Sequence, residues 1–200
     1  DPLQHHGWFV LTESMLKNYP INYFPIELFE YTVSLMPKQG AEFKLSFEKK
    51  EWKKEYLSAF HSLSNGLLKK LKKNDFKKNA FYLKSLLSEF MLLPAFYLTA
   101  KNGKSIYKKN SFSLAKKDFN NQEWKVMEKV SEIRENWNYK ISFIQQFLLN
   151  HSTFVIRKFG RKNAPEIPPK LVNQLNDDFL SEMKSLVVNM RNKVESESYD

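Results

Sequence analysis

Several residue types are absent or scarce in this chain, and each absence excludes a class of protein. There is no cysteine among the 200 residues, which excludes a disulfide scaffold, a cysteine nucleophile and a thiolate-bound metal. Glycine occurs only five times while 15% of the residues are aromatic, and this excludes a disordered or collagen-like chain. No apolar run in the sequence approaches the roughly 18 residues that span a bilayer, so we expect no membrane partner.

Sequence signatures of common enzyme classes are missing as well. The chain has no G-x-S-x-G, H-E-x-x-H, G-x-G-x-x-G, P-loop or D-x-D motif. Its one close acidic pair, Asp177 and Asp178, falls in a predicted helix, where neighbouring side chains diverge by about 100°. Two-metal chemistry needs carboxylates that converge on the ions, and the sequence does not supply a complete set. Residues 1–3 are Asp-Pro-Leu, with neither Met nor a secretory signal, so we expect a cytoplasmic piece of a longer protein.

Arginine is scarce too, and this bears on the meaning of the net charge of +10. Only four of the 32 basic residues are Arg. The charge is −3 over residues 1–37, +13 over residues 38–117 and zero over residues 118–200. A positive block attracts polyanions such as nucleotides, nucleic acid or an acidic protein. Arg, the preferred partner of phosphates and base edges, is absent from that block. A solvated helix surface is therefore the favoured interpretation, and a nucleic-acid surface is the alternative.

The apolar pattern predicts one strand followed mostly by helices. Residues 7–13 are aromatic and β-branched and predict a buried strand. From residue 46 onward, apolar side chains recur at helical spacing with lysines on the other face. The Asn65-Gly66 pair interrupts this pattern, which then continues or restarts. The proline pair at residues 168–169 begins a single final helix that carries an apolar stripe as far as Met190.

Caps and prolines predict several helix boundaries. Asn74 or Asp75 is expected to cap the next helix by accepting from the N–H groups of its first turn. Pro94 is expected to kink or end that helix, because proline has no N–H and its ring clashes with the preceding turn. Asn120 and Glu123 have the spacing of a capping box, with Asn in place of Ser or Thr. We therefore expect a mainly helical chain.

One candidate functional cluster lies at the start of the chain. Asp1, His5 and His6 bring a carboxylate and two imidazoles close to the predicted strand. Neighbouring side chains on a regular strand point to opposite faces, so the two histidines face one substrate only if the chain turns there, which Gly7 permits. Ordinary hydrogen-bonded histidines are the competing interpretation.

A second candidate cluster lies in residues 103–111. Lys104, Lys108 and Lys109 are close in sequence to several hydroxyl side chains, Ser111 among them. If a helix begins here, its first N–H groups and the ammonium groups both favour phosphate oxygens, and the segment forms an anion cradle. The competing interpretation is a Lys-rich exposed loop without a ligand.

Two stretches of the chain resemble uncharacterised prokaryotic nucleotidyltransferases of the DNA-polymerase-β-like superfamily, which also contains the aminoglycoside nucleotidyltransferases. The first is DPLQHHGWFVLTE at residues 1–13, with Tyr19 and the FPIE of residues 24–27 after it. The second is MLLPAFYL at residues 91–98, then Gly103 and the YKKNSF of residues 107–112. Further matches follow in the expected order, at Trp124, Ile133, Arg134 and Trp137.

The resemblance implies a role for each candidate residue. In that superfamily a small α/β domain carries a D-x-D pair that holds Mg²⁺, and a helical domain closes the substrate cleft. The D-x-D pair would then lie upstream of Asp1, so the Mg²⁺ ligands are expected mainly outside this chain, which by itself is expected to be inactive. Lys104, Lys108 and Lys109 would approach the triphosphate with Ser111 assisting. The active-site mouth would be lined by Asp1, His5 and His6, with Glu13 as a supporting carboxylate.

The expected fold class is therefore mainly α, a bundle-like helical domain preceded by a short strand left from an α/β catalytic sheet. The expected function is the substrate- and nucleotide-binding portion of an enzyme that moves an NMP group from an NTP to an acceptor hydroxyl. The alternative is a non-enzymatic helical module that binds nucleic acid or an acidic protein. The expected parts are the catalytic-domain tail and connector at 1–37, the helical domain at 38–160, a linker at 161–169, a C-terminal helix at 170–194 and a frayed tail at 195–200.

Overall fold

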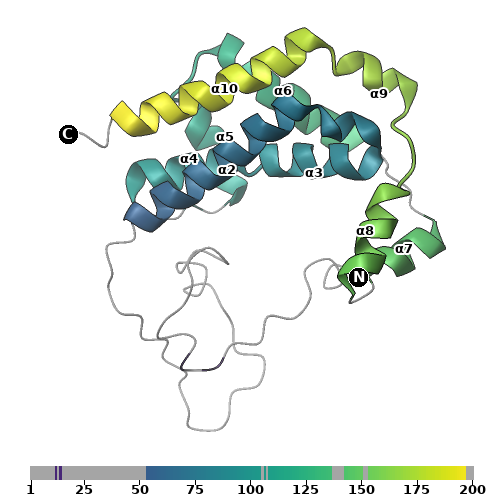
Figure 1. Cartoon of the computed structure of the whole chain (residues 1–200). Coiled ribbons are helices and arrows are strands. Elements are labelled where there is room, and N and C mark those ends of the chain that lie inside the picture. Colours follow the sequence, from purple (N-terminus) through teal and green to yellow (C-terminus); the bar gives the residue numbers. More distant parts are fainter. Residues whose placement is uncertain are drawn as a thin grey trace, which may run out of the picture.

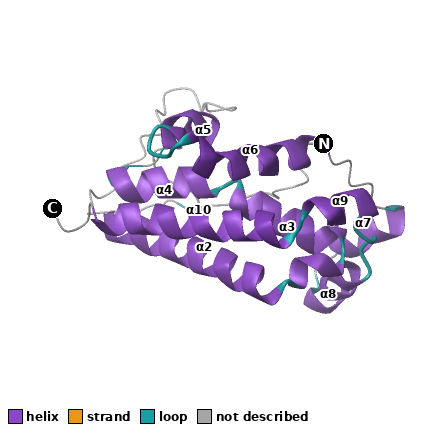
Figure 2. Cartoon of the chain, turned by 90° about the horizontal axis from the view of Figure 1, so that it is seen from above, coloured by secondary structure: helices purple, strands orange, loops and turns teal. Residues whose placement is uncertain are grey.

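The computed structural model describes residues 53–104, 106, 108–136, 142–150 and 153–196, together with Thr12 and Ser14. These residues are mainly helical and contain no strand, which confirms the coarse fold class (Figure 2). The predicted strand at residues 7–13 lies outside the described residues apart from Thr12. The described helices are α2 (Lys53–Lys73), the 3₁₀ helix η3 (Asp75–Lys78), α3 (Ala80–Phe90), α4 (Leu93–Asn102), α5 (Lys108–Lys116), α6 (Asn121–Asn136), α7 (Phe143–Asn150), α8 (Phe154–Lys162), α9 (Pro169–Gln174) and α10 (Asp177–Ser196).

The helical body is organised around α2, which packs against α4 and α10 (Figure 1). α10 also packs against α6, so the two longest helices bring the first and last described parts of the chain together. Phe60 on α2 is fully buried and meets Tyr97 on α4 edge to face, with ring centroids 6.3 Å apart. Burying a side chain such as Phe60 stabilises the fold by about 1.5–3 kcal/mol, and the core contains many such residues from all of these helices.

The structure shows α2 as one continuous helix through Gly66, so the expected interruption at Asn65-Gly66 does not occur. A single helical glycine costs only about 1 kcal/mol relative to alanine. The buried face of α2 continues on both sides of it, with Phe60 before and Leu67 and Leu71 after. Packing of this face therefore outweighs the local preference of one glycine.

The cap of α3 is Asn79 rather than Asn74 or Asp75. Its side-chain oxygen accepts from the backbone N–H groups of Phe81 (3.1 Å) and Tyr82 (3.2 Å). Asn74 instead has a left-handed backbone (φ 54°) just after α2, and Asp75 pairs with a lysine inside η3. The short 3₁₀ helix separates the two long helices, and the sequence pattern gave no sign of it.

Asn79 also fastens the segment that follows α8. Its side-chain amide donates to the backbone oxygens of Arg161 (3.0 Å) and Lys162 (3.3 Å). The backbone N–H of Ala80 donates to the oxygen of Pro165 at 2.8 Å, and Ile167 is buried in the core. The expected linker thus begins inside α8 and is held against the start of α3.

Pro94 lies at a helix boundary, as predicted. α3 ends at Phe90, and Pro94 occupies the first turn of α4, where its missing N–H leaves no bond unmade. The stretch Ala80–Asn102, which contains both helices, is long and apolar enough to cross a membrane. This is weak evidence for a span, because core helices meet the same criterion, and Leu87 and Tyr97 within the stretch are fully buried.

Two further helix starts gave opposite outcomes. The capping box is confirmed: Glu123 N–H donates to the Asn120 side-chain oxygen (2.9 Å), and Asn120 N–H donates to the Glu123 carboxylate (3.0 Å). The single final helix is wrong, because the chain breaks between α9 and α10. Asn176 begins α10 there, and its side-chain oxygen accepts from Phe179 N–H at 2.9 Å.

Candidate functional site

The candidate anion cradle lies where α4 ends and α5 begins. α4 is closed by Gly103 in a left-handed conformation (φ 62°). Lys104 follows it as an exposed residue, and Lys108 and Lys109 are exposed in the first turn of α5. We call these three lysines the basic turn. The first turn of α5 contains no acidic residue, so its N–H groups and the basic turn form one positive surface.

The orientation of α5 explains which of its side chains face solvent. Ser111 and Ala115 are buried, and Phe112 meets Trp124 on α6 edge to face at 6.3 Å. This packing directs one face of α5 toward the core and leaves Lys108 and Lys109 on the other. The Ser111 hydroxyl is buried and donates to the backbone oxygen of Lys108 at 2.7 Å. The sequence analysis grouped Ser111 with the lysines, but its hydroxyl is turned away from the solvent that they face.

A polar cluster holds α4 and the end of α5 together beneath this surface. The Tyr97 hydroxyl donates to Asp118 Oδ2 at 2.8 Å, and Lys101 Nζ donates to the same oxygen at 3.0 Å. Burial raises the pKa of the Asp118 carboxyl, but hydrogen bonds from Tyr97 and Lys101 and the charge of Lys101 outweigh it, and the pKa is lowered overall. Asp118 is therefore a charged anchor at neutral pH.

Neighbouring cations differ in whether they have an acidic partner. Lys101 is paired with Asp118, and Lys116 with Glu128 at 2.7 Å. Within the described residues, no ion pair involves the basic turn. The three lysines of the basic turn are thus the cations of the α4–α5 region whose charge is available to a ligand.

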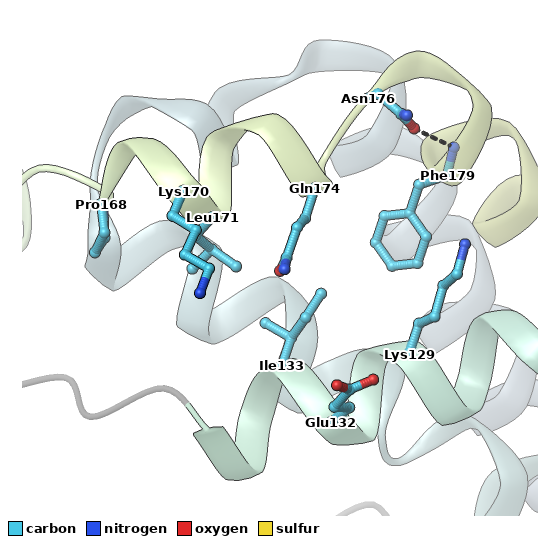
Figure 3. Close-up of a pocket in the computed structure, with 9 residues that line it drawn as sticks. All are labelled: Lys129, Glu132, Ile133, Pro168, Lys170, Leu171, Gln174, Asn176 and Phe179. Atoms are coloured by element: carbon cyan, nitrogen blue, oxygen red, sulfur yellow. Dashed lines mark hydrogen bonds between the residues drawn. The ribbon is translucent and has the colours of Figure 1, made fainter.

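A pocket of about 640 Å³ lies elsewhere, between α6, α9 and the start of α10 (Figure 3). Lys129 on one wall lies 5.6 Å from the ring centroid of Phe179 and 3.8 Å from Glu182. Gln174 and Ile133 point toward one another across the space. The pocket depends on the break between α9 and α10, which explains why sequence reasoning missed it. Its lining residues are Lys129, Glu132, Ile133, Pro168, Lys170, Leu171, Gln174, Asn176 and Phe179.

The basic turn and this pocket are separate sites. Figures 1 and 2 both place α9 toward one end of the helical body, with α4 and α5 toward the other. The pocket wall mixes Lys129 and Lys170 with Glu132 and amide side chains, so it does not present charge of one sign. The basic turn is therefore the better match to a phosphate.

The remaining predicted site residues lie outside the described part of the chain: these are Asp1, His5, His6 and Glu13. Among the residues that the structure does describe, no group of three His, Asp or Glu side chains is placed to hold a metal ion. The roles given to these four residues, and the Mg²⁺ site, stay predictions.

The nucleic-acid alternative depended on aromatic side chains exposed within the basic block. Tyr56 and Phe60, two of the aromatic residues there, are buried in the core, so neither forms a stacking platform for bases. This observation favours a phosphate ligand at one place over a long nucleic-acid track.

Comparison with known proteins gives no assignment, since no protein-family model, no curated protein and no solved structure matches the chain.

Proposed function

We propose that this chain is the helical nucleotide-binding portion of a nucleotidyltransferase, and that the basic turn holds the triphosphate of an NTP. The observation that carries the proposal is the exposed group Lys104, Lys108 and Lys109, which has no acidic partner among the described residues. The resemblance of residues 91–98 and 107–112 to nucleotidyltransferases supports it, because those stretches supply α4 and α5.

The chemistry assigns the basic turn a limited role. In NMP transfer the acceptor oxygen forms a bond to the α-phosphorus, the bond from that phosphorus to the bridging oxygen breaks, and pyrophosphate leaves. Negative charge grows on the leaving group, and fixed ammonium groups near the β- and γ-phosphates offset it. Mg²⁺ supplies the same kind of charge compensation when bound. Since the described residues contain no converging carboxylates for it, we derive no step through the metal.

The anchor beneath the basic turn makes this role physically reasonable. Asp118 binds both Tyr97 and Lys101, so the end of α4 and the end of α5 are tied together by one carboxylate. A fixed turn loses less conformational entropy when it binds a ligand than a free loop does. The lysines themselves stay solvated, so we expect weak binding by the helical part alone.

Titration of Mg²⁺–ATP into the 200-residue chain by calorimetry tests the proposal. Lys108→Ala together with Lys109→Ala should weaken binding about tenfold, since two partly screened contacts of roughly 0.7 kcal/mol each are lost. The matched control is Lys72→Ala with Lys73→Ala, which removes two exposed lysines from the end of α2. Equal losses in both double variants, or wild-type binding that survives the first, would refute the proposal.

A further inference from the structure

An exposed apolar face occurs on the hairpin that α7 and α8 form. Nine large apolar side chains of the described residues are exposed, and six of them belong to these two short helices. Their exposed fractions run from 58% to 86%, whereas the other three lie between 38% and 45%. We call the six residues the hairpin face: Phe143, Ile144, Phe147, Phe154, Val155 and Phe159.

The hairpin needs a packing partner beyond itself. α7 has eight residues and α8 nine, and isolated helices shorter than about 12–15 residues are marginal in water. The two helices pack mainly against one another, at the edge of the helical body (Figure 1). A contiguous apolar patch of this kind marks an interaction surface in a folded protein.

The charge around the hairpin face defines its partner. No acidic residue occurs between Glu135 and Glu166. Lys158 and Lys162 on α8 are exposed, so the apolar side chains are accompanied by positive charge only. The complementary surface is therefore apolar, aromatic and acidic.

One segment of this chain has that composition. Residues 1–37 carry a net charge of −3 with a single lysine, and seven of them are aromatic. They are joined to Lys53 at the start of α2 by residues 38–52, which reach roughly 50 Å when extended. α2 itself has 21 residues and is about 30 Å long. The far end of α2 leads directly to α3, whose cap residue Asn79 bonds the end of α8, so the hairpin is within reach.

We propose that the hairpin face is the docking surface for residues 1–37 of this chain. The contact joins aromatic and apolar side chains of that segment to the exposed face of α7 and α8, with its carboxylates near Lys158 and Lys162. This goes beyond the proposed function and does not depend on nucleotide binding. Where both hold, the contact sets the position of the catalytic part relative to the basic turn.

Hydrogen exchange of the full 200-residue chain, read by mass spectrometry, tests the docking. The variant is Phe143→Asp with Phe154→Asp, because each residue opens its helix and an acidic side chain there favours the helix itself. It removes apolar area and repels an acidic segment. We expect peptides from residues 1–37 and 143–162 both to exchange at least about tenfold faster, while α4 and α10 keep their rates. Val188→Asp, a change of an exposed apolar residue on α10, should leave all four regions unchanged.

Several outcomes would overturn the docking. One is faster exchange in 143–162 with none in 1–37. Another is a wild-type dimer that the variant abolishes in sedimentation, which would assign the face to a second copy. A third is binding to phosphatidylcholine–phosphatidylglycerol vesicles that the variant abolishes, which would assign it to a membrane.

Carbodiimide cross-linking of the wild-type chain gives a measurement that needs no variant. We expect links from Glu27 or Glu30 to Lys158 or Lys162, and links to the basic turn instead would contradict the docking. Loss of Mg²⁺–ATP binding without any change in these links would reject the proposed function alone.

Discussion

Asp118 provides the sharpest test of how the α4–α5 region is held. Replacing it by Ala removes a neutral hydrogen bond from Tyr97 and a charged one from Lys101. Such bonds are worth about 1 kcal/mol and 1.5–3 kcal/mol respectively. Because 26% of the Asp118 side chain faces solvent, screening places the charged bond at the lower end. We expect Asp118→Ala to lower the free energy of unfolding by about 2 kcal/mol, and Asp118→Asn by about 1 kcal/mol.

The same interaction should depend on pH in a defined direction. The folded-state pKa of Asp118 lies below its ordinary value of 3.8, so the folded protein holds this proton less tightly than the unfolded chain does. Its contribution is complete above the ordinary pKa and is lost as the pH falls through the folded-state pKa. The difference between wild type and Asp118→Asn should therefore shrink between about pH 5 and about pH 3.

Urea unfolding followed by circular dichroism measures both effects. Glu128→Gln is the matched control, because Glu128 forms an ion pair of similar length with Lys116 in which both side chains are about half exposed. Its loss should cost less than about 0.5 kcal/mol. A cost for Asp118→Ala no larger than this control, or a pH-independent difference for Asp118→Asn, would refute the reasoning.

Two further predictions concern backbone and caps, and the same urea unfolding assay measures both. Gly66→Ala should stabilise the protein by about 0.5–1 kcal/mol, because it lies inside α2 and an added Cβ meets no atom within 4 Å. Gly103→Ala should destabilise it by about 1 kcal/mol, since φ is +62°, and equal signs for the two would contradict the assignment. Asn79→Ala should cost about 2 kcal/mol, through the cap and the bonds to Arg161 and Lys162. If Asn74→Ala costs as much, the cap is misplaced.

Local signals were predictable from the sequence where both partners lie within one turn. The pair Asn120 and Glu123 is three residues apart, and its capping box formed as expected. Asn79 also caps its own helix, but it does so after the 3₁₀ helix η3, and its remaining bonds go to residues more than 80 positions away. No sequence pattern within one turn carries that information.

The candidate site shows the same division. Exposure of Lys108 and Lys109 follows from an amphipathic α5, and the lysine cluster was recognised from sequence. The inward orientation of Ser111 depends on packing of Phe112 against Trp124, which is a tertiary contact. The α6–α9–α10 pocket needed a helix break at Leu175 and Asn176, where the apolar stripe continues without interruption.

The bonds from Asn79 to the end of α8 have a consequence for synthesis on the ribosome. Its side chain meets the Arg161 carbonyl 82 residues later, and α2 packs against α10, the last described helix. The first helix therefore emerges long before its partner, and its apolar face has no C-terminal cover during that time. A nascent chain stalled before α10 should remain sensitive to protease along α2, and release of the last helix should complete the fold in one step.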